Sequence, residues 1–317
     1  MIEVLDVMGQ DSMGAVVDSL NDLVQHYAQT ISATPSGDVY DEILAVRSYA
    51  NGILKRCGSD RWNPDLSHVI GWLSCLLAIA ACDMKSHAAS HLWCADAERR
   101  SESVGNPKLA GWSTLTRSMI AFYQGRPRES AVLAARGREI TSRGTVAHAK
   151  LAAQEMRATA MTGDSEGMEA ARRYAAQAIS ALPVEVESSG AFSIALAEDP
   201  PYTATSLMLL GRPLEAVAAT KRVIQSCYPA EMGRFGQGCA RYSRTLLILA
   251  LAQAGAGDLD EAVSAGCAAL VDNHPAWPTM VLAGKLDKTL MRNFPSAQVH
   301  EYRDRYLATM SHARNFV

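Results

Sequence analysis

The sequence has few aromatic residues and little net charge, and it lacks the short motifs that mark common enzyme classes. Aromatic side chains make up 6% of its 317 residues, and 30 basic residues nearly balance 33 acidic ones. Without a basic excess, a free-standing nucleic-acid binder is not expected. A Walker loop, a dinucleotide-binding fingerprint, a nucleophile elbow and a zinc-protease motif are all missing. The sequence therefore predicts no catalytic residue, no cofactor and no metal ion.

An export signal and a long hydrophobic run are also missing. The first residues carry no basic cluster followed by an apolar core. The longest apolar stretch, Val69–Cys82, has 14 residues, which is too few to cross a bilayer. Seven cysteines are an odd number, and without an export signal they are expected to be reduced thiols. These features predict a cytoplasmic protein without a membrane partner.

Alanine is the residue that the sequence has in excess, at 51 of 317 positions. Alanine favours helices and is poor in strands. The sequence has no long run of alternating β-branched residues that would suggest a sheet. Helical hydrophobic spacing runs over about 12–31 and again over 39–56, and paired helices are expected after residue 65. The composition and spacing predict an all-α protein.

A turn motif built on glycine recurs along the chain from residue 85 onward. It stands at Gly125, Gly163, Gly211 and Gly257, and a degenerate copy begins at Lys85. Glycine ends a helix with a positive φ, and the Asp or Arg-Pro that follows it starts the next helix. The spacings of 38 to 48 residues indicate an array of helical repeats.

Small residues fall where a helix-pair repeat needs close contact, so the chain resembles the tetratricopeptide repeat (TPR). When each turn residue is aligned to the turn of that repeat, twelve of fifteen helix-contact positions are Ala, Ser or Gly. The fifteen positions are Ala78, Ser90, Ala97, Ser118, Ser130, Gly137, Met156, Met168, Ala175, Ala204, Ala216, Val223, Ala250, Ala262 and Ala269. The resemblance implies a right-handed α-solenoid of TPR-like helix pairs. We expect N-terminal helices over 1–65, TPR-like repeats over 66–275 and a C-terminal capping helix pair over 276–317.

Several stretches are similar to the TPR-like region of bacterial Xre-type helix-turn-helix/TPR transcriptional regulators. They are 23–27, 71–74, 111–127, 210–217 and 244–262, and the similarity covers most of residues 15–310. It implies a role in transcription regulation. Only about eleven residues precede the first predicted helix, and a helix-turn-helix module needs several times that number. Direct contact with DNA is therefore not expected.

The concave face of such an array is the place where a ligand or partner is expected to bind. The predicted groove residues are Trp72, Trp112, Met119, Phe122, Tyr123, Arg157, Met161, Met208 and Arg244. Aromatic and apolar side chains suit an apolar effector, an amphipathic peptide or a partner helix. Cations at Lys150, Arg157 and Arg244 could fix a carboxylate or a peptide backbone. The alternative is that the aromatic residues belong to a core with the N-terminal helices and that the cations are solvated.

Two functions remain open at this point. The first is a non-catalytic, regulatory binding module that holds a peptide, a partner protein or a small apolar effector in its groove. Its end helices would also allow a homodimer. The second is a helical enzyme of specialised metabolism with its active site in the concave cavity and loops 183–200 and 226–238 as lids. A deep pocket that holds Arg157, Arg241 or Tyr242 beside a carboxylate would favour the enzyme.

Three other polar groups have simpler explanations than a site. His87, His91 and Cys94 share a helix face but have no evident fourth zinc ligand nearby in the sequence. Cys239 has no histidine near it to act as a base. The acidic residues Glu185, Glu187, Glu198 and Asp199 fit a solvated loop.

Overall fold

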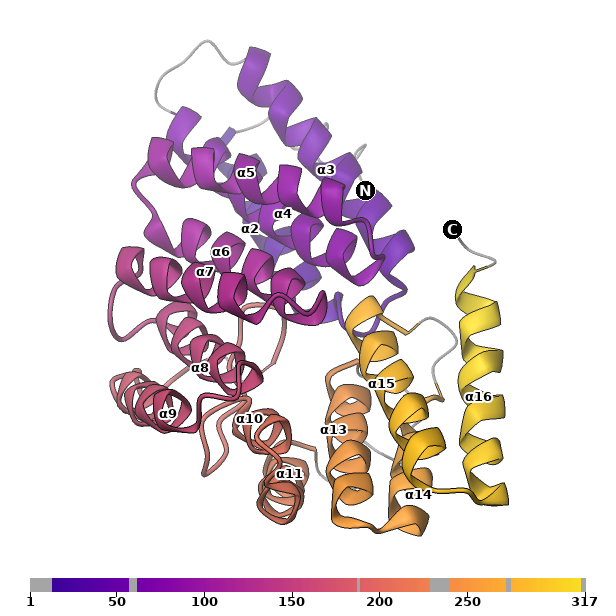
Figure 1. Cartoon of the computed structure of the whole chain (residues 1–317). Helices are drawn as coiled ribbons and strands as arrows, with labels where there is room; N and C mark the ends of the chain where they lie inside the picture. The colour runs from indigo at the N-terminus through magenta and orange to yellow at the C-terminus, as the bar shows by residue number, and fades with distance from the viewer. Residues whose placement is uncertain (1–12, 57–61, 187–188, 229–239, 272–274, 315–317) are drawn as a thin grey trace.

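The chain is a succession of α-helices in the computed structural model (Figure 1). The structure describes residues 13–56, 62–186, 189–228, 240–271 and 275–314. Within these ranges it contains fourteen helices and no strand. The prediction of an all-α protein is therefore confirmed for this part of the chain.

The helices are short and follow one another closely. In order they are α2 (Met13–Thr30), α3 (Ser36–Arg56), α4 (Asn63–Asp83), α5 (His87–Val104), α6 (Pro107–Tyr123), α7 (Pro127–Ile140), α8 (Val146–Met161), α9 (Ser165–Ser180), α10 (Thr203–Leu209), α11 (Pro213–Cys227), α13 (Ala240–Ala256), α14 (Leu259–Ala269), α15 (Trp277–Asn293) and α16 (Ala297–Arg314). Proline occupies the first or second position of α4, α6, α7, α11 and α15, where its missing N–H has no helical partner to lose.

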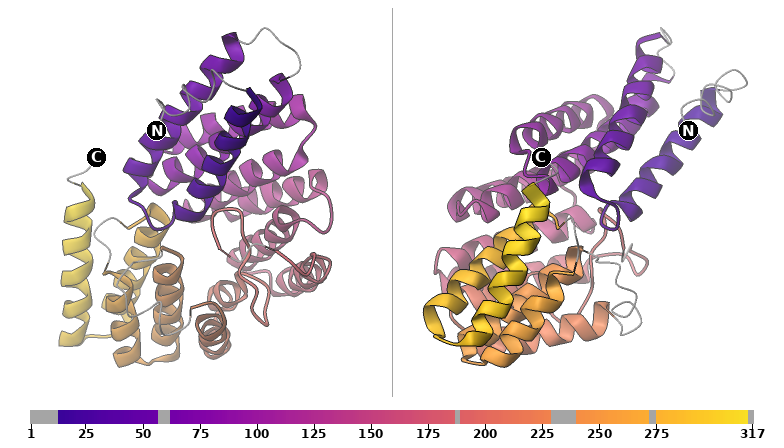
Figure 2. Two further views of the ribbon diagram at one scale, coloured as in Figure 1. Left: turned by 180° about the vertical axis from the view of Figure 1, so that it is seen from behind. Right: turned by 90° about the vertical axis from the view of Figure 1, so that its right-hand side faces the viewer.

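Consecutive helices from α4 to α14 pack as pairs, and the first helices of the pairs also pack on one another. The pairs are α4 with α5, α6 with α7, α8 with α9, α10 with α11 and α13 with α14. The first helices form a continuous row, in which α4, α6, α8, α10, α13 and α15 each contact the next. Figure 2 shows that α2 and α3 lie at one end of this arrangement and α14 to α16 at the other.

The two ends of the row meet. Helix α15 contacts α4, although their sequences are almost two hundred residues apart. Trp277, the first residue of α15, places its ring 4.2 Å from the His87 ring and 5.9 Å from the Tyr123 ring, measured between centroids. The inner helices therefore form a row that returns to its start, with α8, α10 and α13 below α4 in Figure 1.

The predicted turns and contact positions are found in the structure. Gly125, Gly163, Gly211 and Gly257 all have a positive φ, and Lys85 takes the same conformation in the degenerate first copy with φ 64°. Fourteen of the fifteen predicted contact positions are buried, Val223 being half-buried. At one of them, Ser118 and Ser130 exchange hydrogen bonds between α6 and α7. Small side chains at these positions let the paired helices approach closely.

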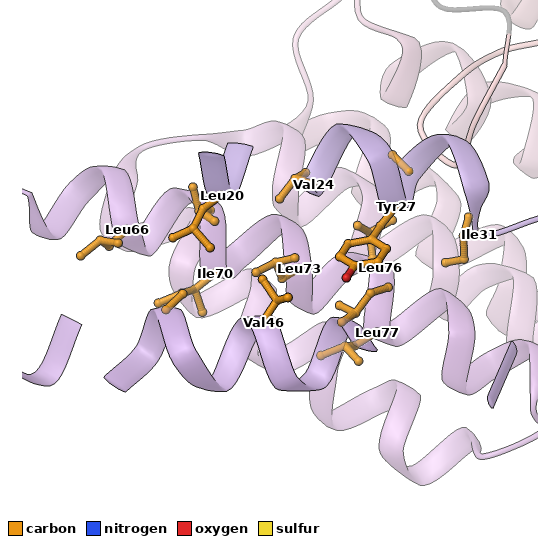
Figure 3. Close-up of a cluster of buried hydrophobic side chains, with 14 of the residues drawn as sticks. Leu20, Val24, Tyr27, Ile31, Val46, Leu66, Ile70, Leu73, Leu76 and Leu77 are labelled. Carbon is orange, nitrogen blue, oxygen red and sulfur yellow. The ribbon is translucent and has the colours of Figure 1, made fainter. Parts of the chain in front are cut away.

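The largest hydrophobic cluster lies where α2 and α3 cover α4 (Figure 3). Leu20 and Tyr27 from α2 and Val46 from α3 meet Ile70 and Leu73 of α4. Helix α4 is the one helix of the described chain that is long and apolar enough to cross a membrane, and most of it is buried in the fold. Burial among other helices is what the core helix of a soluble protein shows.

The fourth pair departs from the others because its first helix is short. Helix α10 has only seven residues, since the described residues between α9 and Thr203 are not helical. Residues 189–202 of this connection, called the strap below, cross the inner face of the array beside the end of α2 (Figure 2, left). The Ala191 amide donates a 2.6 Å hydrogen bond to the Ala28 carbonyl oxygen. The strap thus covers part of the face where the sequence predicts an open groove.

Candidate ligand cavity

The inner helices and the strap enclose a cavity of about 230 Å³. Its walls come from α4, α6, α8, α10, α11 and α13, with the strap as one side. Pockets for drug-sized ligands occupy roughly 300–1,000 Å³, so this space suits a smaller molecule. The cavity therefore lies among the first helices of the pairs.

Helix periodicity explains how one apolar wall of the cavity is built. Helix α6 contributes Trp112, Leu115, Met119 and Tyr123, which follow one another at spacings of three or four residues. Side chains at these spacings share one face of a helix. Ile248 of α13 also lines the space. The cavity therefore has an apolar and aromatic side.

The same periodicity places cations in the cavity. Lys150 and Arg157 lie two turns apart on α8, and Arg241 and Arg244 lie one turn apart on α13; all four line the cavity. Arg244 has no hydrogen bond or ion pair with any residue that the structure describes. The cations of two helices thus converge on one space beside the apolar wall.

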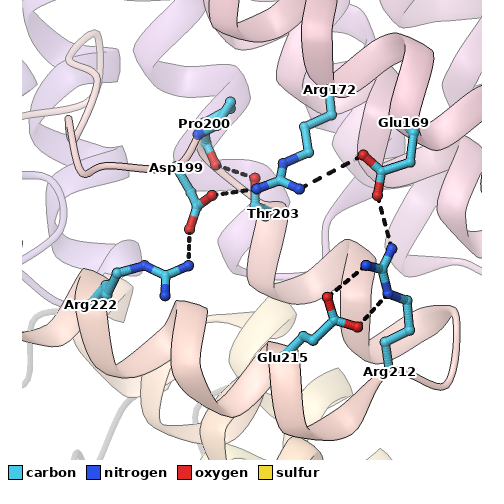
Figure 4. A network of polar contacts seen from close by, with 8 residues as sticks. All are labelled: Glu169, Arg172, Asp199, Pro200, Thr203, Arg212, Glu215 and Arg222. Atoms are coloured by element: carbon cyan, nitrogen blue, oxygen red, sulfur yellow. Dashed lines mark hydrogen bonds and ion pairs between the residues drawn. The ribbon is translucent and has the colours of Figure 1, made fainter.

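Two carboxylates also line the cavity, but only one of them faces the cations unpaired. Asp199 is bound by Arg172, at 2.6 Å, and by Arg222 (Figure 4). Because of these hydrogen bonds the pKa of Asp199 is lowered, although burial alone would raise it. Asp83 has no ion pair within 4 Å among the described residues. When all of these groups are ionised, the four cations outnumber Asp83, which is the one lining carboxylate without an ion pair among the described residues.

Burial shifts the pKa values of Asp83 and Lys150 in opposite directions. Burial raises the pKa of Asp83 to about 6, while the charges of Arg244 and Arg241 act to lower it. Burial also lowers the pKa of Lys150 well below its usual value, and the repulsion of Arg241 and Arg244 adds to this effect. Both shifts favour the neutral form of the group, as expected in a site shielded from water.

Arg157 is held in place by aromatic rings rather than by a carboxylate. Its side chain is 2% exposed, and its guanidinium carbon lies 4.0 Å from the centroid of the Tyr202 ring and 4.1 Å from that of Phe122. One nitrogen donates to the Gln154 side-chain oxygen. Tyr202 has a positive φ of 69°, a conformation that is strained for a residue with a side chain. The strap therefore ends in a strained residue that covers the arginine.

Two buried polar atoms at the cavity have no hydrogen-bond partner among the described residues. They are Nε of Arg157 and Oγ1 of Thr205, and both residues line the space. Buried polar groups are nearly always paired, and leaving one unpaired costs about 1–3 kcal/mol. Both atoms are buried within the cavity wall, so a molecule in the cavity reaches them only if the wall moves.

The strap also occupies the aromatic positions next to the cavity. The Phe192 ring lies 4.6 Å from Trp72 and 5.2 Å from Trp112, measured between centroids. Lys150 donates a 3.2 Å hydrogen bond to the Ser193 carbonyl, and Arg241 donates to the Ser193 hydroxyl at 2.9 Å and to the Gly190 carbonyl. Two of the cavity cations are thus held by neutral groups of the strap.

The structure brings five of the nine predicted groove residues to the cavity wall. These are Trp112, Met119, Tyr123, Arg157 and Arg244. Trp72 packs on Phe192 and donates a hydrogen bond to His68. Phe122 lies beneath the Arg157 guanidinium. Met208 packs between hydrophobic clusters around α10 and α13, and Met161 is half-buried at the end of α8.

Sequence reasoning missed three cavity residues as site candidates. Asp83 stands at a repeat position that normally faces the groove, so the same register identifies it. Thr205 stands at a different groove-facing position of the repeat, in the fourth copy. Tyr202 could not be found in this way, because its place depends on the path of the strap.

The other polar candidates lie away from a common site. The His87 ring packs against Trp277, and the buried Cys94 thiol donates to the Ser113 carbonyl. Among the described residues no group of three or more His, Cys, Asp or Glu side chains is placed to hold a metal ion. Cys239, Glu187 and most of loop 226–238 lie outside the described residues.

The shifted carboxyl of Asp83 leads to a test by pH. The folded state favours the protonated form, so ionisation lowers stability as the pH rises from about 4, the unfolded pKa, through the folded pKa near 6. Asp83→Asn cannot ionise. We expect the variant to gain stability relative to the wild type, by roughly 1–2 kcal/mol more at pH 8 than at pH 5. Urea unfolding at several pH values measures this, and a difference that does not change with pH would contradict the assignment.

Comparison with known proteins gives no family. No protein-family model matches the sequence, and no curated protein matches it. The functional conclusion therefore depends on the cavity and its residues.

Proposed function

We propose that the chain is a non-catalytic binding module that holds a small molecule in its central cavity. The observation that carries this proposal is that cations from two helices, with few counter-charges, converge on a cavity that also has an apolar and aromatic wall. Such a site costs stability when it is empty. Sites of this kind are retained where a ligand uses them.

The architecture we propose is a right-handed α-solenoid of TPR-like helix pairs. The recurring turn residues and the buried small positions support it, as does the row of first helices in contact. The similarity to Xre-type regulators supports a regulatory role in the cytoplasm, with the ligand as an effector. The unpaired state of the described cysteines agrees with a reducing compartment.

A small molecule suits the cavity better than a peptide. An extended peptide would lie across Trp72 and Trp112, where the strap places Phe192. Displacing the strap would also break the hydrogen bonds of Lys150 and Arg241. A small ligand enters the remaining space without this cost.

The test of this proposal compares dye binding by the wild type with dye binding by a variant whose cavity is filled by a larger side chain. The probe is N-phenyl-1-naphthylamine, a neutral apolar dye that fluoresces when it leaves water. We expect one saturable site per chain in the wild type, and at least tenfold weaker binding in Thr245→Trp, which places a large ring in the cavity. Thr162→Trp is the matched control, since Thr162 is exposed. Equal dye binding in all three proteins would contradict the proposal.

A second candidate function is catalysis in the same cavity. It is favoured by Asp83 and Lys150, whose pKa values burial shifts toward neutrality within one enclosed site beside Arg157 and Arg241. Native mass spectrometry of the purified protein, followed over time, separates the two functions. A bound molecule of constant mass supports binding. Conversion to a new mass that stops in Asp83→Asn supports an enzyme.

A further inference from the structure

We propose that the ligand of this cavity is an organic anion: an apolar or aromatic body that carries a carboxylate, sulfonate or phosphate group. The anionic group would lie against Arg244, with Lys150 and Arg241 beside it, and the body against Trp112 and Met119. This inference rests on the proposed function and names the chemical class of its ligand.

The residues that line the cavity have an excess of positive charge. Lys150, Arg157, Arg241 and Arg244 reach it from two helices, and Asp199 is already neutralised by Arg172 and Arg222. Among the described residues that line the cavity, Asp83 is the one carboxylate left near the cations. Cations brought together out of water repel one another, and an added negative charge removes that repulsion.

The cations of the cavity lack a charged hydrogen-bond partner among the described residues. Lys150 and Arg241 bind carbonyl and hydroxyl oxygens of Gly190 and Ser193, which are neutral acceptors. Arg244 has no hydrogen-bond acceptor in the described structure. Hydrogen bonds to a charged acceptor are about twice as strong as those to a neutral one. An anion thus offers Arg244 its missing partner and offers the other two cations a stronger one.

The cavity also combines its cations with an apolar surface. The cationic residues of α8 and α13 line the same cavity as the apolar stripe of α6. Inorganic phosphate would meet the charges but would leave the wall of Trp112, Leu115 and Met119 uncovered. A neutral apolar molecule would cover the wall but would leave Arg244 without a partner. Only a molecule with both parts satisfies both surfaces.

Two dyes that differ by one charged group test the inference. 8-Anilinonaphthalene-1-sulfonate has the body of N-phenyl-1-naphthylamine plus a sulfonate. We expect the sulfonate dye to bind the wild type at least tenfold more tightly than the neutral dye. In Arg244→Gln we expect sulfonate-dye binding to weaken about tenfold and neutral-dye binding to change less than twofold, as expected for the loss of one charge-assisted hydrogen bond.

Controls separate this inference from the proposed function. Arg173→Gln removes one exposed cation elsewhere and should bind both dyes as the wild type does. If circular dichroism shows that Arg244→Gln does not fold, Lys150→Met takes its place, because it replaces the buried amine with a neutral thioether. If the wild type binds both dyes with equal affinity, the inference that the ligand is an anion is wrong. Failure of both dyes to bind overturns the proposed function as well.

Competition against the sulfonate dye distinguishes the possible anions. The competitors are 3-phenylpropionate, phenyl phosphate, the neutral 3-phenylpropionamide and inorganic phosphate. We expect the two aromatic anions to displace the dye and the amide to fail, and the stronger of the two identifies the anionic group. Displacement by inorganic phosphate at the same concentration would contradict the role of the apolar wall.

Discussion

Phe192→Ala is expected to lower the free energy of unfolding by about 3 kcal/mol. The ring fills the space between Trp72 and Trp112, at centroid distances of 4.6 and 5.2 Å. Its removal takes one ring contact from each indole and creates a void where three aromatic rings now meet. Chemical denaturation monitored by tryptophan fluorescence measures the loss.

The loss should come with release of the strap. The Ala191 amide, which donates to Ala28, is expected to exchange its hydrogen faster in the variant than in the wild type. Leu196→Ala is the matched control, because Leu196 belongs to the strap but is 46% exposed. Its stability should change by less than about 0.5 kcal/mol.

The outcome also decides whether the strap belongs to the folded core. Equal stability of Phe192→Ala and the wild type would show that the strap rests on the array without supporting it. The groove in front of Trp72 and Trp112 would then be open to a peptide. A large loss with faster exchange supports the enclosed cavity on which the proposed function depends.

Gly137→Leu is expected to destabilise the protein by roughly 3 kcal/mol, at the upper end of the cost of overpacking a core. Gly137 lies on α7, where a β-carbon would stand 2.8 Å from a methyl carbon of Leu151 and 3.0 Å from the methyl of Thr114. These atoms belong to α8 and α6, so a side chain at this position forces three helices apart. Thermal unfolding with a denaturant check measures the change.

Gly52→Ala is the matched control, and it is expected to raise the free energy of unfolding instead of lowering it. Gly52 also lies inside a helix, α3, but a β-carbon there would have only Arg56 Nη1 nearby, at 3.9 Å. Alanine in an uncrowded helix position gains about 0.5–1 kcal/mol over glycine. If both variants are stabilised, the close contact of α6, α7 and α8 is not required, and the small-residue register loses its physical basis.

The candidate site was partly predictable from the sequence. The repeat register placed Trp112, Met119 and Arg157 on one face, and all three line the cavity. Trp72 lies on the same predicted face, but the strap covers it with Phe192. The register describes only the helices, so it contains no information about what a connecting segment covers.

The sequence by itself determined the helices, the turns between them and the positions where they touch. These depend on local properties: alanine content, glycine with a positive φ at the turns and small residues at a regular spacing. Only the tertiary structure decided that the row of helices closes through Trp277 and that the strap crosses it. Only there do Asp83, Lys150 and Arg244 meet in one enclosed space. The shifted pKa values of Asp83 and Lys150 depend on burial and on neighbours far apart in the chain, which no local pattern records.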